Sequence, residues 1–169
     1  KDVYSKKELI DLGISQSSIK TLEKHEVLIA QDQEVQRDIK HQFSLHDKKV
    51  ILTNEQEKAV SSIGSKLSSY ETFLLKGITG SGKTEVYLSV IEDVIKKGKQ
   101  VLVLVPEITL IAPMAKRLKS RFDQVAIYHS ALSQGEKYDQ YRMIFEHQAS
   151  IVLGTRSAVF LPLESLGLI

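Results

Sequence analysis

The sequence has 169 residues, of which 42% are apolar and 26% are charged, and its formal net charge at pH 7 is +2. This composition is typical of a globular protein, and the absence of cysteine excludes cysteine-bound zinc, iron–sulfur clusters and thiol catalysis within these residues. No apolar run approaches the ~20 residues of a membrane helix, and the charged first residues do not form a signal peptide, so we expect a cytoplasmic protein without a membrane partner. Because the first residue is lysine rather than methionine, we also expect a processed product or a piece of a longer protein.

The N-terminal part predicts a small winged-helix domain. Residues 5–25 predict two short helices, because serine capping residues and a glycine stop signal bracket their apolar positions. Residues 27–30 and 34–37 are expected to form the two strands of a hairpin. We therefore assign residues 1–40 to a winged-helix-like domain and residues 41–51 to a linker.

The second N-terminal helix carries side chains that can contact DNA phosphates or base edges. Residues 1–49 hold nine basic and nine acidic side chains, so this part has no net positive charge, which weakens the case for tight DNA binding. A structural or protein-docking helix pair is an equally supported alternative. The candidate DNA-binding residues are Gln16, Ser17, Lys20 and Lys24.

Residues 52–169 alternate between helical patterns and short apolar runs, which predicts a parallel α/β sheet with flanking helices. This region forms the second expected domain. The expected helices are 53–67, 83–97, 107–122 and 133–147, and the expected strands are 72–76, 101–105, 125–128 and 151–153.

The strongest motif is the Walker A pattern G-x-x-x-x-G-K-T, which lies between an expected strand and an expected helix. Its glycines let the backbone wrap around a phosphate, and the following helix adds its positive end. Lys83 is expected to reach the β- and γ-phosphates of ATP, and the Thr84 hydroxyl is expected to bind Mg²⁺, which makes both candidate catalytic residues. A glycine- and serine-rich loop with a solvated lysine fits this context far less well. The candidate ATP-binding residues are Gly77, Ile78, Thr79, Gly80, Ser81, Gly82, Lys83 and Thr84.

Gln56 lies ~20 residues before this loop and has two interpretations. A glutamine amide offers a donor and an acceptor, so it can recognise the edge of adenine. Thr53-x-x-Gln56 is also a capping box, in which the same side chain only closes the start of a helix. The chemistry of the residues supports both interpretations equally.

Two polar segments follow expected strands. Gly154-Thr155-Arg156-Ser157 has the residue types that grip a phosphate backbone, although a plain polar loop is the better interpretation from these residues alone. His129-Ser130 is a weaker candidate, because a single histidine is more often structural.

Further motifs accompany the Walker A loop along residues 52–169. They are Leu52-Thr53-x-x-Gln56, Glu85-Val86-Tyr87, Leu104-Val105-Pro106-Glu107-Ile108-x-Leu110, His129-Ser130-x-Leu132-Ser133-x-Gly135-Glu136-x-Tyr138, Gly154-Thr155-Arg156-Ser157-Ala158 and Leu166-Gly167-Leu168-Ile169. Together they resemble the first helicase lobe of the PriA family of replication-restart helicases, within superfamily 2. The N-terminal part resembles that family's winged-helix domain.

This resemblance implies a RecA-like P-loop sheet in an ATP-dependent helicase that moves 3′ to 5′ on single-stranded DNA at stalled forks. It implies ATP and Mg²⁺ as cofactors and makes Gln56 the adenine reader. The implied partners are forked and single-stranded DNA, primosome proteins and single-strand DNA-binding protein, in the bacterial cytoplasm at the nucleoid. The implied DNA-contact residues of the lobe are Pro106, Glu107, Gly154, Thr155, Arg156 and Ser157.

The family's acidic Walker B motif, Asp-Glu-Glu-His, would follow the strand that begins at Leu168-Ile169, where this sequence ends. The sequence also lacks the family's second helicase lobe with its arginine finger, its zinc-binding insertion and its 3′-end-binding domain. We therefore expect an incomplete lobe that binds ATP phosphates and DNA without turning over ATP, and zinc only in the full-length family protein.

Two other functions compete with this one. A nucleotide-regulated winged-helix DNA-binding regulator would need a complete, self-contained sheet, and an end in the apolar segment 166–169 disfavours it. A small P-loop kinase would need an arginine-rich lid, which we do not find in the sequence.

Overall fold

The computed structural model describes residues 4–30 and 50–169. The chain divides into two compact units, residues 1–36 and 37–169, and each is described by itself. The expected linker 41–51 lies almost wholly outside the described residues, so the boundaries of the domains stay a prediction.

The first unit contains α1 (Lys6–Asp11) and α2 (Gln16–Lys24), which confirms the two predicted helices. A capping box starts α1: the Ser5 backbone N–H donates to the Glu8 carboxylate over 2.7 Å, and the Glu8 N–H donates to the Ser5 hydroxyl over 3.2 Å. Between the helices Gly13 has a φ of +87°, the left-handed conformation that glycine adopts without strain.

The strand predicted at 27–30 does not form, so that prediction is wrong. Instead, Glu26 turns the chain with a φ of +58°, and the N–H groups of Val27 and Leu28 both donate to the Leu22 carbonyl. These donors close the end of α2 and are not free for a strand ladder. The second expected strand, 34–37, lies outside the described residues, and the winged helix therefore stays a prediction.

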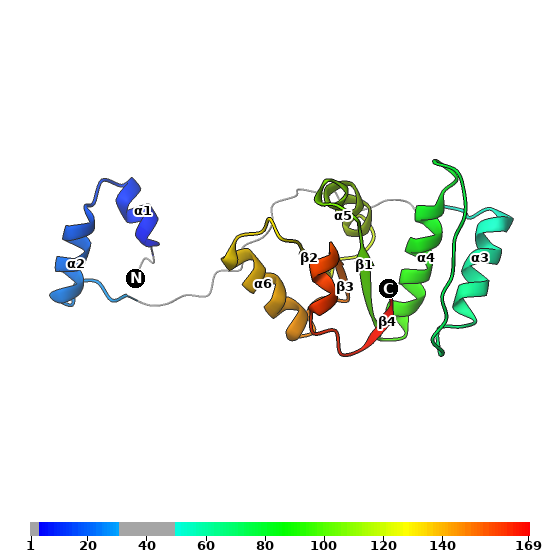
Figure 1. Cartoon of the computed structure of the whole chain (residues 1–169). Coiled ribbons are helices and arrows are strands. Elements are labelled where there is room, and N and C mark those ends of the chain that lie inside the picture. Colours follow the sequence, from blue (N-terminus) through cyan, green and yellow to red (C-terminus); the bar gives the residue numbers. More distant parts are fainter. Residues whose placement is uncertain (1–3, 31–49) are drawn as a thin grey trace. The chain divides into compact units, whose positions relative to one another are not determined.

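The second unit holds a four-stranded parallel sheet in the order β2-β3-β1-β4, which confirms the predicted α/β fold (Figure 1). Val101 of β1 and Val125 of β2 both pair with Ile151 of β3, so residues at the same position in these three strands lie side by side. Because the strands run the same way, their carboxyl ends meet at one edge of the sheet. The strands are β1 (Gln100–Leu104), β2 (Val125–Tyr128), β3 (Ile151–Gly154) and β4 (Leu166–Leu168).

The helices of this unit lie close to their predicted positions. The predicted helix 107–122 is divided, because it begins as a short 3₁₀ turn and Pro113, which has no N–H, falls in the first turn of the α-helix that follows. The elements are α3 (Asn54–Gly64), α4 (Lys83–Lys96), η1 (Ile108–Leu110), α5 (Ile111–Lys119), α6 (Gln134–Phe145) and η2 (Arg156–Phe160).

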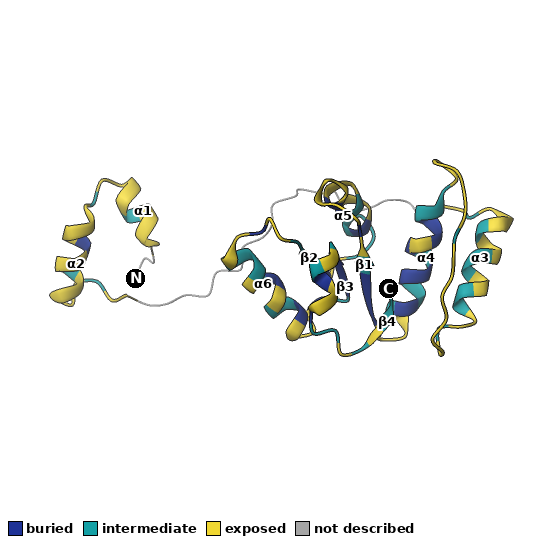
Figure 2. Ribbon diagram, in the orientation of Figure 1, coloured by how far each residue is buried: buried dark blue, intermediate teal, exposed yellow. Residues whose placement is uncertain are grey.

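Two apolar layers cover the two faces of the sheet. Val101 packs in a cluster with side chains of α4 and α5, whereas its neighbour Leu102 packs with Ile144 of α6 and Ala158 of η2. Successive strand residues point to opposite faces, which explains why these runs are apolar without interruption. Figure 2 shows the buried positions in the strands and on the inward sides of α4 and α5. Among the described residues, no helix combines the length and apolarity needed to cross a bilayer.

The strand predicted at 72–76, directly before the Walker A loop, is also wrong for this structure. Residues 70–78 form neither helix nor strand, and the Leu74 side chain is 92% exposed. Within the described residues the sheet ends at β4, which has three residues and an irregular register with β1. Such a short edge offers few backbone groups for another ladder, so the three apolar residues of this segment, Phe73, Leu74 and Leu75, do not by themselves secure a place in the sheet.

Candidate functional site

The Walker A loop lies at the N-terminus of α4. Gly80 and Gly82 have φ values of +81° and +78°, and Gly82 is the residue that caps the helix. Only glycine adopts this left-handed conformation freely, so the loop needs both residues to turn its backbone toward the start of α4. The first N–H groups of a helix lack partners within it, and they form a natural site for an anion.

Two side chains lie close to glycines of this loop. A Cβ atom at Gly77 would lie 2.7 Å from the hydroxyl oxygen of Ser81. A Cβ atom at Gly82 would collide with the side-chain amide nitrogen of Gln56. Both atoms are the ends of flexible side chains, so the requirement for glycine rests on the left-handed conformations of Gly80 and Gly82, which turn the backbone into a cradle of the kind that phosphates occupy.

Lys83 points back into this loop. Its Nζ donates to the carbonyl oxygens of Gly77 and Ile78 over 2.7 and 2.8 Å. These bonds hold the ammonium group against the loop and engage two of its three hydrogens. Lys83 thus places a positive charge within the loop that the sequence predicts to bind phosphate.

Gln56 contacts the same loop from α3. Its Oε1 accepts from the Thr53 N–H over 2.9 Å, and the Gln56 N–H donates to the Thr53 hydroxyl over 3.3 Å, which confirms the capping box. Its Nε2 also donates to the Ser81 carbonyl over 3.2 Å, so one amide closes α3 and ties it to the phosphate loop. The recognition of adenine by Gln56 stays a prediction.

Three other polar segments meet at the carboxyl edge of the sheet. Gly154 pairs with Leu104 of β1 and with Tyr128 of β2, and the Val105 N–H donates to the Gly154 carbonyl over 2.9 Å. The segments that follow these strands are therefore neighbours: Pro106–Glu107 after β1, His129–Ser130 after β2 and Thr155–Ser157 after β3.

Gly154 is required at this edge by its surroundings. A Cβ atom there would collide with the Tyr128 carbonyl oxygen and would lie 2.5 Å from the Ala158 Cβ. Glycine lets β3 turn directly into η2, which begins at the exposed Arg156. The structure thus brings Pro106, Glu107 and the segment 154–157 together, while their contact with DNA stays a prediction.

The same edge carries both buried side-chain polar atoms that lack a hydrogen-bond partner within the described residues. They are His129 Nδ1 and Ser157 Oγ. Burial lowers the pKa of the His129 imidazole below its usual value of 6.5, while Glu136 raises it and Lys137 lowers it by smaller amounts. His129 is therefore neutral at pH 7.

We expect the His129 ring to titrate below pH 6.5 in the folded chain, because burial disfavours the imidazolium. Since the folded-state pKa is lower than the unfolded one, folding should lose stability as the pH falls from 6.5 through the folded value. Proton NMR of the histidine ring protons, assigned by comparison with His129→Gln, gives the midpoint. A midpoint at or above 6.5 would contradict the effect of burial.

The candidate DNA-binding residues of the N-terminal unit all lie on α2. Their side chains are exposed, and the Ser17 hydroxyl lies 2.8 Å from that of Ser15, the residue that caps the helix. Lys20 and Lys24 are one helical turn apart on the same helix.

The structure also reveals an ionic cluster that sequence reasoning missed. Glu85, directly after Thr84, accepts from Arg117 Nη1 over 3.1 Å and from Arg121 Nη2 over 2.6 Å. Glu85 is part of the sequence motif Glu85-Val86-Tyr87, but nothing in the spacing pointed to two arginines more than 30 residues away. The part of the chain that the structure describes contains no group of three or more His, Cys, Asp or Glu residues able to hold a metal ion.

Comparison with known proteins gives a consistent family. Residues 49–166 match the family described as type III restriction enzyme, res subunit. The chain is 48% identical over 160 residues to replication restart protein PriA of Bacillus subtilis (strain 168), a match that covers 92% of this chain and 20% of that protein. It is 51% identical over 119 residues to the protein of that name from Synechocystis (70% and 14% covered) and 41% identical over 162 residues to that from Chlamydia pneumoniae (92% and 21%). The chain thus spans at most about a fifth of the length of these relatives.

Proposed function

Because this chain belongs to the family described as type III restriction enzyme, res subunit, and resembles part of replication restart protein PriA, we propose that it belongs to an ATP-dependent DNA helicase that restarts stalled replication forks. In this proposal the chain contributes the phosphate loop and one DNA-binding edge of the first helicase lobe. The whole protein moves 3′ to 5′ on single-stranded DNA, in the cytoplasm at the nucleoid.

The observation that carries the proposal is the geometry of residues 77–84. The loop has two left-handed glycines, lies at the N-terminus of a fourteen-residue helix and holds a lysine ammonium against its own carbonyls. An anion entering the loop would meet the positive end of α4 and the Lys83 charge together. A triphosphate satisfies all three features at once.

The same residues fit ATP with Mg²⁺. The loop amides and Lys83 would hold the phosphates, the Thr84 hydroxyl would be a ligand of the metal, and Gln56 would lie beside the adenine. ATP supplies the free energy of phosphoryl transfer when it is bound. The chain's own contribution is to bind and orient the phosphates, and zinc is proposed only for the whole protein.

The carboxyl edge of the sheet supports DNA binding. Pro106–Glu107 and the segment 154–157 follow neighbouring parallel strands, so one strand of DNA can contact both. Most protein–DNA hydrogen bonds go to phosphates and sugars, which suits the hydroxyls and the arginine of this segment. Forked and single-stranded DNA, primosome proteins and single-strand DNA-binding protein are the proposed partners.

The alternative function is a nucleotide-regulated winged-helix DNA-binding regulator. Since residues 27–30 form no strand, the structure adds no support for this alternative.

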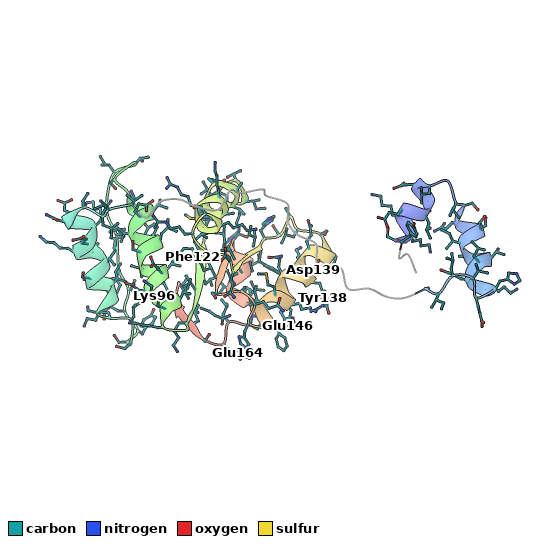
Figure 3. The ribbon with its side chains drawn as sticks, turned by 180° about the vertical axis from the view of Figure 1, so that it is seen from behind. Lys96, Phe122, Tyr138, Asp139, Glu146 and Glu164 are labelled. Carbon is teal, nitrogen blue, oxygen red and sulfur yellow. The ribbon has the colours of Figure 1, made fainter. Side chains whose placement is uncertain are left out.

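Replacing Arg156 with alanine should weaken binding of single-stranded DNA by roughly 10-fold or more, because a hydrogen bond to a charged group contributes about 1.5–3 kcal/mol. Fluorescence anisotropy with a labelled oligonucleotide at fixed low salt measures the change. Lys96→Ala is the matched control: it removes one positive charge from the last turn of α4, at the opposite end from the phosphate loop (Figure 3). An equal loss in both variants would indicate a general charge effect and would contradict a specific contact by Arg156.

A further inference from the structure

Glu85 joins the phosphate-loop helix to another part of the lobe. It is the third residue of α4, and its side chain is 11% exposed. Each carboxylate oxygen has its own arginine, Oε1 with Arg117 and Oε2 with Arg121, and Arg121 is itself only 12% exposed. The carboxylate is therefore held from two directions, which fixes its position more closely than a single bond would.

Both arginines belong to the segment that continues the candidate DNA-binding loop. The chain passes from β1 through Pro106–Glu107 into η1, and η1 continues directly into α5 at Ile111. Arg117 lies in the last turn of α5, and Arg121 follows it by four residues. A displacement of α5 along its axis therefore also moves the end of the Pro106–Glu107 loop.

Apolar packing alone does not explain why this contact is ionic. Leu88 and Ile91 of α4 already share a core cluster with Ala115 and Leu118 of α5. A buried ion pair is often no more stabilising than apolar side chains of similar size. What the ion pairs add is a defined geometry, because one charge-assisted bond joins α4 to Arg117 of α5 and a second joins it to Arg121, just after the end of α5.

We propose that Glu85 is a positioning residue that couples occupancy of the phosphate loop to the loop at Pro106–Glu107, acting through Arg117 and Arg121. Glu85 lies two residues after Lys83, in the first turn of α4. In this proposal, an anion bound at the start of α4 shifts the carboxylate as well. The two arginines follow the carboxylate and carry α5 with them. This inference rests on the proposed function, because it takes a nucleotide as the occupant of residues 77–84.

Amide hydrogen exchange of the whole 169-residue chain tests the coupling, with and without a saturating non-hydrolysable ATP analogue and Mg²⁺. In the wild-type chain we expect the analogue to slow exchange at least fivefold in residues 77–84 and also in residues 107–112. In Glu85→Gln we expect the slowing in 77–84 to persist and that in 107–112 to fall below twofold. Lys96→Ala, which breaks an exposed ion pair with Glu92 on the same helix, should behave as the wild type does.

A second variant distinguishes a loss of coupling from a local disturbance caused by an unpaired Arg121. Glu85→Gln combined with Arg121→Gln leaves no buried arginine without its carboxylate and should also lose the slowing in 107–112. Slowing in 107–112 that persists in both Glu85 variants, or that is absent from the wild type, would overturn the coupling while leaving nucleotide binding intact. Absence of slowing in 77–84 of the wild-type chain would instead contradict the proposed function.

Discussion

Replacing Lys83 with alanine is expected to weaken ATP binding by roughly 10- to 150-fold. The expected loss follows from the removal of a hydrogen bond between charged groups, which contributes about 1.5–3 kcal/mol. The ammonium group donates to the carbonyls of Gly77 and Ile78, so it already lies at the loop that the phosphates would enter. Titration of a fluorescent ATP analogue against both forms measures the two dissociation constants.

Lys76→Ala is the matched control for this experiment. Lys76 is exposed and directly precedes the loop, so its removal changes the net charge by the same amount without removing the group held at the loop. We expect its effect to be small at moderate salt, because exposed charges are screened. Equal affinities of the Lys83 variant and the wild type would show that Lys83 does not bind phosphate.

The second large effect is expected in the stability of the lobe. Glu85→Ala should lower the free energy of unfolding by about 3 kcal/mol, because it leaves a buried arginine charge without its partner. This value is the lower end of the usual range, since the Arg117 side chain is 53% exposed and stays hydrated, whereas that of Arg121 is only 12% exposed. For a domain of this size the melting temperature should fall by about 6–12 °C.

A double-mutant cycle with Arg121→Ala tests whether the loss comes from the pair. Thermal unfolding of the two single variants and the double variant should give effects that do not add, because the double variant has no unpaired carboxylate or guanidinium at the Arg121 side of the contact. Lys96→Ala, which removes an exposed pair on the same helix, should change stability by no more than about 0.5 kcal/mol. Additive losses in the cycle would show that Glu85 and Arg121 do not stabilise each other.

The helices and most of the strands were predictable because their signals are local. Ser133 and Glu136 form the capping box that their spacing predicted, and α6 begins at the next residue. The apolar runs of β2 and β3 were recognisable because burial on both faces leaves no room for polar positions. The Walker A loop was equally clear, since Gly80 and Gly82 are required by the backbone conformation of the loop itself.

The strands predicted at 27–30 and 72–76 do not form, because strand formation depends on hydrogen-bond partners elsewhere in the chain as well as on local residue type. Residues 27–30 and 72–76 are apolar enough for strands, but a strand forms only when another strand offers its backbone groups. At 27–30 the donors close the end of α2, and at 72–76 no strand of the described sheet pairs with the segment, because the sheet ends at the three-residue strand β4. Neither competition can be seen in the residues of the segment alone.

The sequence by itself determined the glycine-rich Walker A loop, the helix caps and the alternation of strands and helices, because each depends on residues within a few positions of one another. Only the tertiary structure decided the strand order, and with it the meeting of Pro106–Glu107 and the segment 154–157 at one edge. It also decided that Gln56 contacts the phosphate loop and that Glu85 binds two arginines of a distant segment. Such contacts depend on how the helices and loops pack against one another. The side chains involved are 25 to 36 residues apart, and no local pattern marks them as partners.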